Sequence, residues 1–140
     1  MIRYLLDSSA LWRILRDSTL REAWADVVSV GAIGSCHAQR VEFRRSARTI
    51  DEYAQMSGMF DALYPDAPIP KGAWRWIESA QYRLLRQGAH RALSAVDLLI
   101  CATAAQHDLV VLHTDEDFAA AARFIPNVRD RNIYDAPHLD

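Results

Sequence analysis

The stretch from Ser94 to Phe118 constrains the fold of this chain more than any other. Its first half, Ser94 to Ala105, is apolar on almost every side of a predicted helix, and such a helix is stable only when it is buried. Its second half, Leu109 to Leu112, is a β-branched and leucine-rich run of strand length, typical of a buried parallel strand. Each element carries a carboxylate at one end: Asp97 in the first helical turn and Asp115 just after the strand.

The N-terminal segment repeats this arrangement. Residues Ile2 to Leu6 read as a strand that ends directly in Asp7, and a helical run follows. Sites in open α/β sheets form outside the carboxyl ends of the strands. We therefore expect Asp7, Asp97 and Asp115 to share an acidic pocket. Two of them also have simpler explanations, Asp7 as a helix N-cap and Asp97 as the acid of a capping box with Ser94.

The rest of the chain alternates helices with short strand candidates. Apolar residues at helical spacing predict four more helices, at residues 19–30, 36–48, 49–63 and 71–87. Ser35 and Thr49 are placed to cap the second and third of these, and a short alanine-rich helix is predicted between Asp117 and Pro126. The fourth is predicted to pack through one face, formed by Trp74, Ile77, Gln81 and Leu84. With 64–70 as a candidate edge strand and 127–134 as a last strand, the pattern indicates an α/β fold with a mostly parallel sheet.

Composition limits the function classes that fit. At 140 residues the chain predicts a single domain, residues 1–140, with enough length for a hydrophobic core. A membrane span needs about 18 consecutive apolar residues, and no such run is present. The N-terminus lacks a signal-peptide pattern, and Cys36 and Cys101 are too few for a disulfide scaffold. These observations predict a cytoplasmic protein with no membrane partner.

The basic residues are almost all arginines. Lys71 is the only lysine among 16 basic residues, and the planar arginine fork suits phosphate. A compositional bias of the source genome explains the same count equally well, and the net charge of −2 gives no electrostatic argument for nucleic acid by itself. Arg40, Arg44 and Arg48 fall on one face of the predicted helix. Glu42 lies about 200° around that helix from Arg40, so it is either a surface glutamate or a member of the acidic site.

The candidate acids share an all-oxygen chemistry, with no histidine or cysteine at metal-ligand spacing. They are Asp7, Glu42, Asp97, Asp115 and, as a further candidate, Asp117. Hard oxygen ligands suit Mg²⁺ or Mn²⁺, and one or two such ions can activate water and neutralise charge on a phosphoryl group. The set therefore indicates phosphodiester hydrolysis. Thr114 and Asp117 also have capping-box spacing, which leaves Asp117 open between a metal ligand and a helix cap.

In this order the motifs resemble those of the PIN domain, and within that family the VapC-type toxins of bacterial toxin–antitoxin pairs. The resemblance covers essentially the whole chain and rests on four motifs, at residues 5–11 (Leu-Leu-Asp-Ser-Ser-Ala-Leu), 41–43 (Val-Glu-Phe), 94–102 and 111–118 (Val-Leu-His-Thr-Asp-Glu-Asp-Phe). One departure is the segment 35–39, Ser-Cys-His-Ala-Gln, where the family often begins a helix with Thr/Ser-Pro.

The resemblance implies a three-layer α/β/α fold with a mostly parallel central sheet of four to five strands. It also implies an Mg²⁺- or Mn²⁺-dependent endoribonuclease that is dimeric and is held inactive by a cognate antitoxin. The implied catalytic acids are Asp7, Glu42, Asp97 and Asp115. The implied metal ligands are Asp7, Asp97, Asp115 and Asp117, with Ser9 and Thr114 as supporting hydroxyls. Under this interpretation Arg40, Arg44 and Arg48 bind RNA or the antitoxin. The alternative is a PIN-like fold retained as a non-catalytic binding module, although unused clustered acids would repel one another.

Overall fold

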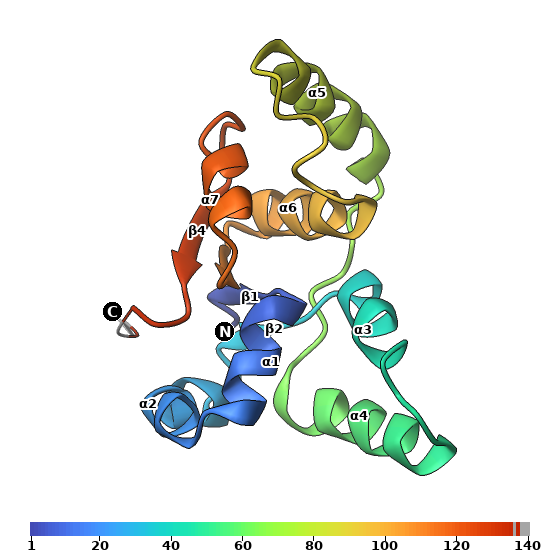
Figure 1. The fold of residues 1–140 in the computed structure, drawn as a ribbon, viewed down its shortest axis with the longest axis vertical. Helices are drawn as coiled ribbons and strands as arrows, with labels where there is room; N and C mark the ends of the chain where they lie inside the picture. The colour runs from blue at the N-terminus through green and yellow to red at the C-terminus, as the bar shows by residue number, and fades with distance from the viewer. Residues whose placement is uncertain (136, 138–140) are drawn as a thin grey trace.

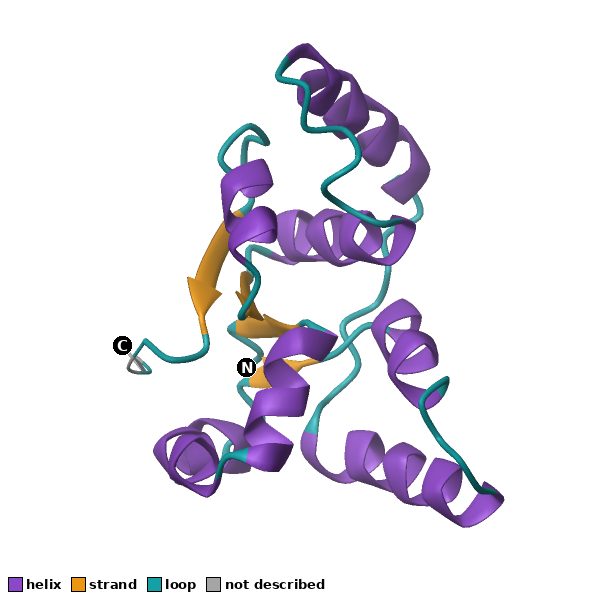
Figure 2. Cartoon of the chain, in the orientation of Figure 1, coloured by secondary structure: helices purple, strands orange, loops and turns teal. Residues whose placement is uncertain are grey.

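The computed structural model describes residues 1–135 and 137, and in this part of the chain seven helices surround a four-stranded sheet (Figures 1 and 2). The strands are β1 (Tyr4–Leu6), β2 (Ile33–Gly34), β3 (Val110–His113) and β4 (Arg129–Asn132). The helices are α1 (Ser8–Arg16), α2 (Ser18–Ser29), α3 (His37–Arg44), α4 (Ile50–Leu63), α5 (Ala73–Arg86), α6 (Ala95–His107) and α7 (Glu116–Ala122). Residues 136 and 138–140, at the end of the predicted domain, lie outside the described residues. No described helix is long and apolar enough to cross a membrane.

The sheet is parallel throughout and has the strand order β2-β1-β3-β4. Leu5 of β1 is paired with Gly34 of β2 on one side and with Val111 of β3 on the other. The prediction of an α/β fold with a mostly parallel sheet is therefore confirmed. Because the strands run the same way, their carboxyl ends meet at one edge, and β1 and β3 bring Asp7 and Asp115 to that edge as neighbours.

Two hydrophobic cores lie on opposite faces of the sheet. Side chains alternate along a strand, so Leu5 and Val111 face one core while Leu6 and Leu112 face the other. Helices α6 and α7 cover the first face, with α5 packed on α6, and α1, α2 and α4 cover the second, with α3 contributing to both (Figure 1). This gives the three layers that the resemblance implied.

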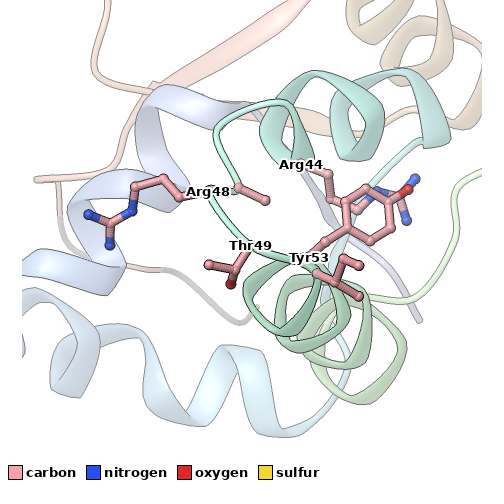
Figure 3. A pocket seen from close by; sticks show the side chains of 6 residues that line it. Arg44, Arg48, Thr49 and Tyr53 are labelled. Atoms are coloured by element: carbon pink, nitrogen blue, oxygen red, sulfur yellow. The ribbon is translucent and has the colours of Figure 1, made fainter.

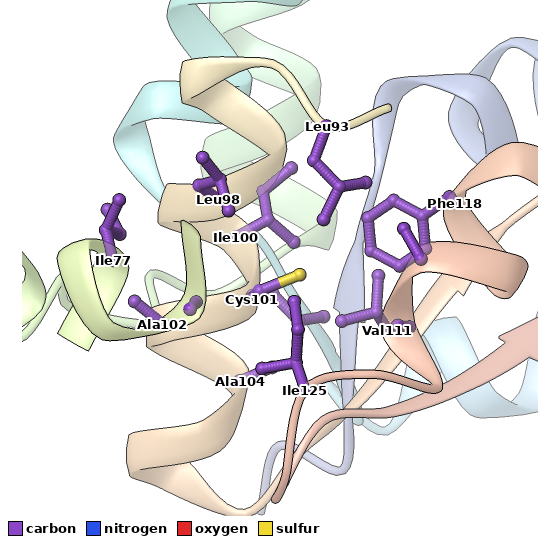
Figure 4. Close-up of a cluster of buried hydrophobic side chains, with 14 of the residues drawn as sticks. Ile77, Leu93, Leu98, Ile100, Cys101, Ala102, Ala104, Val111, Phe118 and Ile125 are labelled. Carbon is purple, nitrogen blue, oxygen red and sulfur yellow. The ribbon is translucent and has the colours of Figure 1, made fainter. Parts of the chain in front are cut away.

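Helix α6 fills the centre of the first core, as its apolar sequence predicted. Its buried residues lie on nearly all sides of the helix: Leu98, Ile100, Cys101, Ala102, Thr103 and Ala104. Figure 4 shows Ile77 of α5 packed on one side of α6 and Phe118 of α7 on the other. The burial of α6 fixes the position of its first turn, which carries Asp97.

Several predicted boundaries between residues 31 and 70 are wrong. Strand β2 lies where no strand was expected, and α3 ends at Arg44 instead of continuing to residue 48. Ser35 does not cap α3, because its hydroxyl accepts a hydrogen bond from Arg40 Nε at 2.7 Å and Cys36 stands at the cap position. The proline-rich segment makes only a single parallel bridge, from Asp66 to Ser35.

The packing face of α5 also differs from the prediction. The buried residues are Ala73, Ile77, Ala80 and Leu84. Trp74 is 67% exposed and Gln81 is exposed as well. The small side chains of Ala73 and Ala80 lie on the side of α5 that packs against α6. The large Trp74 side chain therefore points toward solvent.

Gly34 provides a stability test of the unexpected strand. A Cβ atom there would lie 2.9 Å from Ile2 Cγ2 and 3.0 Å from the backbone oxygen of Pro65, so Gly34→Ala should destabilise the fold by about 1–3 kcal/mol. Gly58 lies in α4 with nothing within 4 Å of its added Cβ, and Gly58→Ala should stabilise by about 0.5–1 kcal/mol. Urea unfolding of both variants checks this. Equal midpoints for the two would contradict the close packing around Gly34.

Candidate active site

Four carboxylates from four elements gather at the carboxyl edge of the sheet. Asp7 follows β1 and Asp115 follows β3. Helix α6 is joined to β3 by two residues and runs back along the sheet, so its first turn places Asp97 at the same edge. Glu42 lies on α3, which follows β2 and packs against both α1 and α6. The ends of β1 and β3, the first turn of α6 and the side of α3 therefore bring these four acids to the same region of the molecule.

Asp7 is almost completely buried and is held by Ser9. The side-chain Oδ2 of Asp7 caps α1 by accepting hydrogen bonds from the Ser9 backbone N–H at 3.1 Å and the Ser9 hydroxyl at 2.5 Å. The same Ser9 oxygen accepts a hydrogen bond from the Thr114 backbone N–H at 3.1 Å. Ser9 therefore connects the end of β1 to the end of β3. Thr114 makes this connection through its backbone and not through its hydroxyl.

Asp115 is the N-cap of α7. Its Oδ1 accepts hydrogen bonds from the backbone N–H groups of Asp117 at 2.9 Å and Phe118 at 3.2 Å. The predicted Thr114–Asp117 capping box is therefore wrong, because Asp115 takes the cap position one residue later. Asp117 lies in the exposed first turn of α7, and its carboxylate makes no hydrogen bond or ion pair with a described residue.

His113 and Asp130 fix the backbone of Asp115, and neither residue was predicted from the sequence to take part in the site. His113 is 2% exposed, and its Nδ1 accepts the Asp115 backbone N–H at 3.0 Å. The proton of the ring must then be on Nε2, which donates to Asp130 Oδ2 at 2.7 Å. The available signal was a polar residue at the end of an otherwise apolar buried strand.

Asp97 is held by the predicted capping box, which is confirmed. Its Oδ2 accepts a hydrogen bond from the Ser94 N–H at 2.9 Å, while its own N–H donates to Ser94 Oγ at 3.1 Å. Burial raises the pKa of Asp97 above its ordinary value, and the charges of Asp7 and Asp115 raise it further against the lowering effect of Ser94. The pKa of Asp97 is therefore sensitive to the charges of both Asp7 and Asp115.

Glu42 is half-buried and is coupled to the same group. Burial is the main cause of its raised pKa; the Ser8 hydroxyl lowers the pKa, and the charges of Asp7 and Asp97 raise it. Gln39, fully buried one turn earlier on α3, donates from Nε2 to Ser8 Oγ at 3.0 Å. Ser8 and Gln39 thus support Glu42, and nothing in the local sequence pattern distinguished them from ordinary helix residues.

The donor chemistry of this group fits a divalent cation. In the part of the chain that the structure describes, no three His, Cys, Asp or Glu side chains are already arranged as a ligand set. Each aspartate nevertheless uses one carboxylate oxygen in the hydrogen bonds above, and the second oxygen accepts none from a described residue. Free carboxylate oxygens suit Mg²⁺ or Mn²⁺. Burial first, and the neighbouring charges next, raise the pKa values of Glu42 and Asp97, and a cation among these acids would offset both effects.

The predicted arginine face does not form as expected. Arg40 is 5% exposed, and its guanidinium donates to Ser35 Oγ and, at 2.8 Å, to the Tyr64 carbonyl. Arg40 therefore stabilises the interior of the protein. The prediction that Arg40 binds RNA or the antitoxin and does not stabilise the fold is wrong. Arg48 lies beyond the end of α3, so it does not share a helical face with Arg44.

Arg44 and Arg48 line a hollow of about 460 Å³ between α3 and α4 (Figure 3). The Arg44 guanidinium lies over the Tyr53 ring, 5.2 Å from its centroid, and donates to Ser57 Oγ at 3.3 Å. Arg48 extends away from Tyr53, and its Nε lies 3.3 Å from the Glu52 carboxylate. Ile50 also lines this hollow and is exposed.

Comparison with known proteins identifies the family of the chain and agrees with its fold. The PIN domain family model matches residues 4–124. The chain is 59% identical to Ribonuclease VapC6 of Mycobacterium tuberculosis over 105 residues, covering 75% of this chain and 83% of the relative. It is 34% identical to Ribonuclease VapC2 of the same species, covering 96% of each. The DNA-bound VapBC of Salmonella typhimurium is similar in fold, with a TM-score of 0.76, 18% identity, and coverage of 95% of this chain and 99% of that one. The chain therefore belongs to the PIN domain family.

Proposed function

We propose that this chain is a metal-dependent endoribonuclease toxin that hydrolyses RNA phosphodiester bonds and is neutralised by a cognate antitoxin. The observation that carries the proposal is the placement of Asp7, Glu42, Asp97 and Asp115 at the carboxyl edge of the sheet. The relatives named as ribonucleases support RNA as the substrate. Neighbouring carboxylates repel one another, and a bound cation would offset that repulsion.

Asp7, Asp97 and Asp115 would hold Mg²⁺ or Mn²⁺, as one or two ions, with Asp117 as a further candidate ligand. When bound, such an ion supplies charge neutralisation at the phosphate and lowers the pKa of water. Ser9 keeps Asp7 in place, Ser94 keeps Asp97 and His113 keeps Asp115, by the hydrogen bonds described above. Glu42, with its raised pKa, is suited to exchange a proton with attacking water or the leaving oxygen.

A protein partner fits the α3–α4 junction. Val41 is 55% exposed, Ile50 88% and Tyr53 48%, and large apolar side chains exposed together mark protein contacts. Arg44 and Arg48 flank them and would pair with acidic groups of the antitoxin. We also propose a homodimer, as the resemblance to VapC-type toxins implies.

Removal of divalent metal should abolish RNA cleavage. The purified chain is incubated with RNA in EDTA, and then with excess Mg²⁺ or Mn²⁺, and fragments are counted by sequencing. We expect cleavage to disappear in EDTA and to return with metal. Mn²⁺ at about 100 times its dissociation constant should also stabilise the fold by about 2.7 kcal/mol.

Asp7→Asn is the matched variant for the stability measurement, since it removes one proposed ligand while keeping an oxygen for the α1 cap. Its melting temperature should rise less with Mn²⁺ than that of the wild type. Undiminished cleavage in EDTA would contradict the metal dependence. No cleavage with or without metal, together with equal Mn²⁺ shifts for the two proteins, would favour the alternative of a non-catalytic binding module.

A further inference from the structure

Positive charge is concentrated in one segment of this acidic chain. Residues 71–93, which are α5 and its flanking loops, contain five Lys or Arg residues and one acid, Glu78, a net charge of +4. The remaining residues contain 11 basic and 17 acidic side chains, a net charge of −6. An RNA strand approaching the carboxylates therefore meets repulsion from most of the chain and attraction from this segment.

The basic side chains of this segment are exposed and free to bind a ligand. Lys71, Arg75, Arg83, Arg86 and Arg91 are all exposed. Among the described residues none of them has an ion pair with a carboxylate, whereas Arg40, Arg48 and Arg129 each have one. Charges that are neither paired nor needed for packing contribute little to folding, so their concentration on one helix calls for another explanation.

Aromatic side chains lie among these arginines. Tyr82 is 62% exposed and has the Arg86 guanidinium 4.9 Å from its ring centroid. Together with Arg75, Glu78, Ser79 and Arg83 they line a hollow of about 480 Å³ on the outer face of α5. Trp74 is exposed one turn before Glu78. Exposed rings that accept base stacking, beside arginines that contact phosphates, are what sequence-tolerant binding of single-stranded nucleic acid needs.

We infer that the outer face of α5, formed by Arg75, Tyr82, Arg83 and Arg86, binds single-stranded RNA on its way to the acidic site. This inference rests on the proposed ribonuclease function and adds a location for the substrate. Charge complementarity favours RNA over a protein partner on this face, because its arginines are accompanied by only one acid. Its exposed aromatic rings can also stack on RNA bases. The apolar character of the α3–α4 junction is better suited to a protein.

The loop after α5 connects this face to the carboxylates. Arg91 precedes Asp97 by six residues. The first three can be at most fully extended, and the last three form the first turn of α6, so the Cα atoms of Arg91 and Asp97 are within about 16 Å of each other. Leu93 is 5% exposed and anchors the loop in the core next to Phe118 and Leu98 (Figure 4). A strand that leaves α5 past Arg91 is then within a few nucleotides of Asp97.

The test measures binding of a fluorescein-labelled 12-nucleotide single-stranded RNA to proteins that also carry Asp97→Asn, so that the RNA stays intact. Replacing Arg75, Arg83 and Arg86 with Gln should weaken binding at least ten-fold and reduce the salt slope by about 2, at about 0.7 per lost phosphate contact. Replacing Arg13, Arg16 and Arg123, which are exposed on other helices or loops, removes the same charge and should leave the slope unchanged. Tyr82→Ala should weaken binding about five-fold or more through lost stacking.

With Asp97 intact, the α5 triple variant should raise the KM for RNA cleavage while kcat is unchanged. Equal salt slopes for the two triple variants would overturn the inference, and cleavage by the wild type would then leave the proposed function standing. A wild type that neither binds nor cuts RNA would overturn both. Sedimentation completes the test: a dimer that becomes monomeric in the α5 triple variant, with RNA affinity unchanged, would assign this face to a contact between copies and overturn the inference.

Discussion

Asp97→Asn is expected to lower RNA cleavage by at least about two orders of magnitude while the fold remains intact. The asparagine keeps an Oδ1 that can accept the Ser94 N–H, so the capping box that starts α6 survives. What is lost is the negative charge that would hold the cation and the polarised water. Single-turnover cleavage in Mn²⁺ measures the effect. Asp26→Asn, on the exposed side of α2, is the matched control and should cleave at the wild-type rate.

The same variant should be more stable than the wild type in EDTA at neutral pH. Burial first, and the charges of Asp7 and Asp115 next, raise the pKa of Asp97 in the folded state. A raised carboxyl pKa means that ionisation disfavours the folded state: this loss of stability is absent below the unfolded pKa of about 4 and is complete above the folded pKa. The difference between the two proteins should therefore grow as pH rises from about 4 and then become constant.

Melting temperatures measured in EDTA between pH 3 and pH 8 check this result. Glu42, whose pKa is raised in the same direction, remains in the variant and leaves part of the pH dependence in place. A variant that melts below the wild type at neutral pH, with cleavage unimpaired, would show that Asp97 is only the acid of a capping box.

Sequence patterns predicted the features that depend on local contacts. The Ser94–Asp97 capping box and the Thr49 cap on the Glu52 N–H join residues three positions apart, so the pattern contains all of the interaction. The burial of α6 follows from its apolar composition alone. The acidic edge could also be predicted, because Asp7 and Asp115 directly follow apolar strands, and parallel strands end at a common edge.

Features that depend on distant partners could not be predicted in the same way. Strand β2 has only two residues and is a strand because β1 is beside it. The choice of Asp115 over Thr114 as the cap of α7 depends on where β3 ends and on the acceptor that His113 provides, which in turn is oriented by Asp130, 17 residues later. Arg40, Arg44 and Arg48 looked equivalent by spacing, yet only Arg40 meets the carbonyl of Tyr64.

Arg40→Ala is expected to destabilise the protein by about 2–4 kcal/mol. The change removes two hydrogen bonds and leaves the buried Ser35 hydroxyl and Tyr64 carbonyl without their charged donor, which costs more than the bonds themselves contribute. It also removes the guanidinium packed 5.4 Å from the Phe60 ring centroid and opens a cavity in the second core. The ion pair with Asp61 at 3.5 Å adds little, because the Asp61 side chain is 79% exposed.

Arg48→Ala is the matched control, because the Arg48 side chain is 86% exposed and its one ion pair with a described residue is to Glu52. Its effect should stay within about 0.5 kcal/mol. Arg40→Lys should fall between the two, since an ammonium group keeps the charge but cannot donate in the planar, forked geometry that reaches both oxygens. Denaturant unfolding followed by circular dichroism gives all three values, and the lysine variant remains measurable if Arg40→Ala does not fold. Equal midpoints for Arg40→Ala and Arg48→Ala would contradict the structural role of Arg40 and support the original prediction that it binds a ligand. A guanidinium that donates to two buried oxygens cannot be removed without loss of stability.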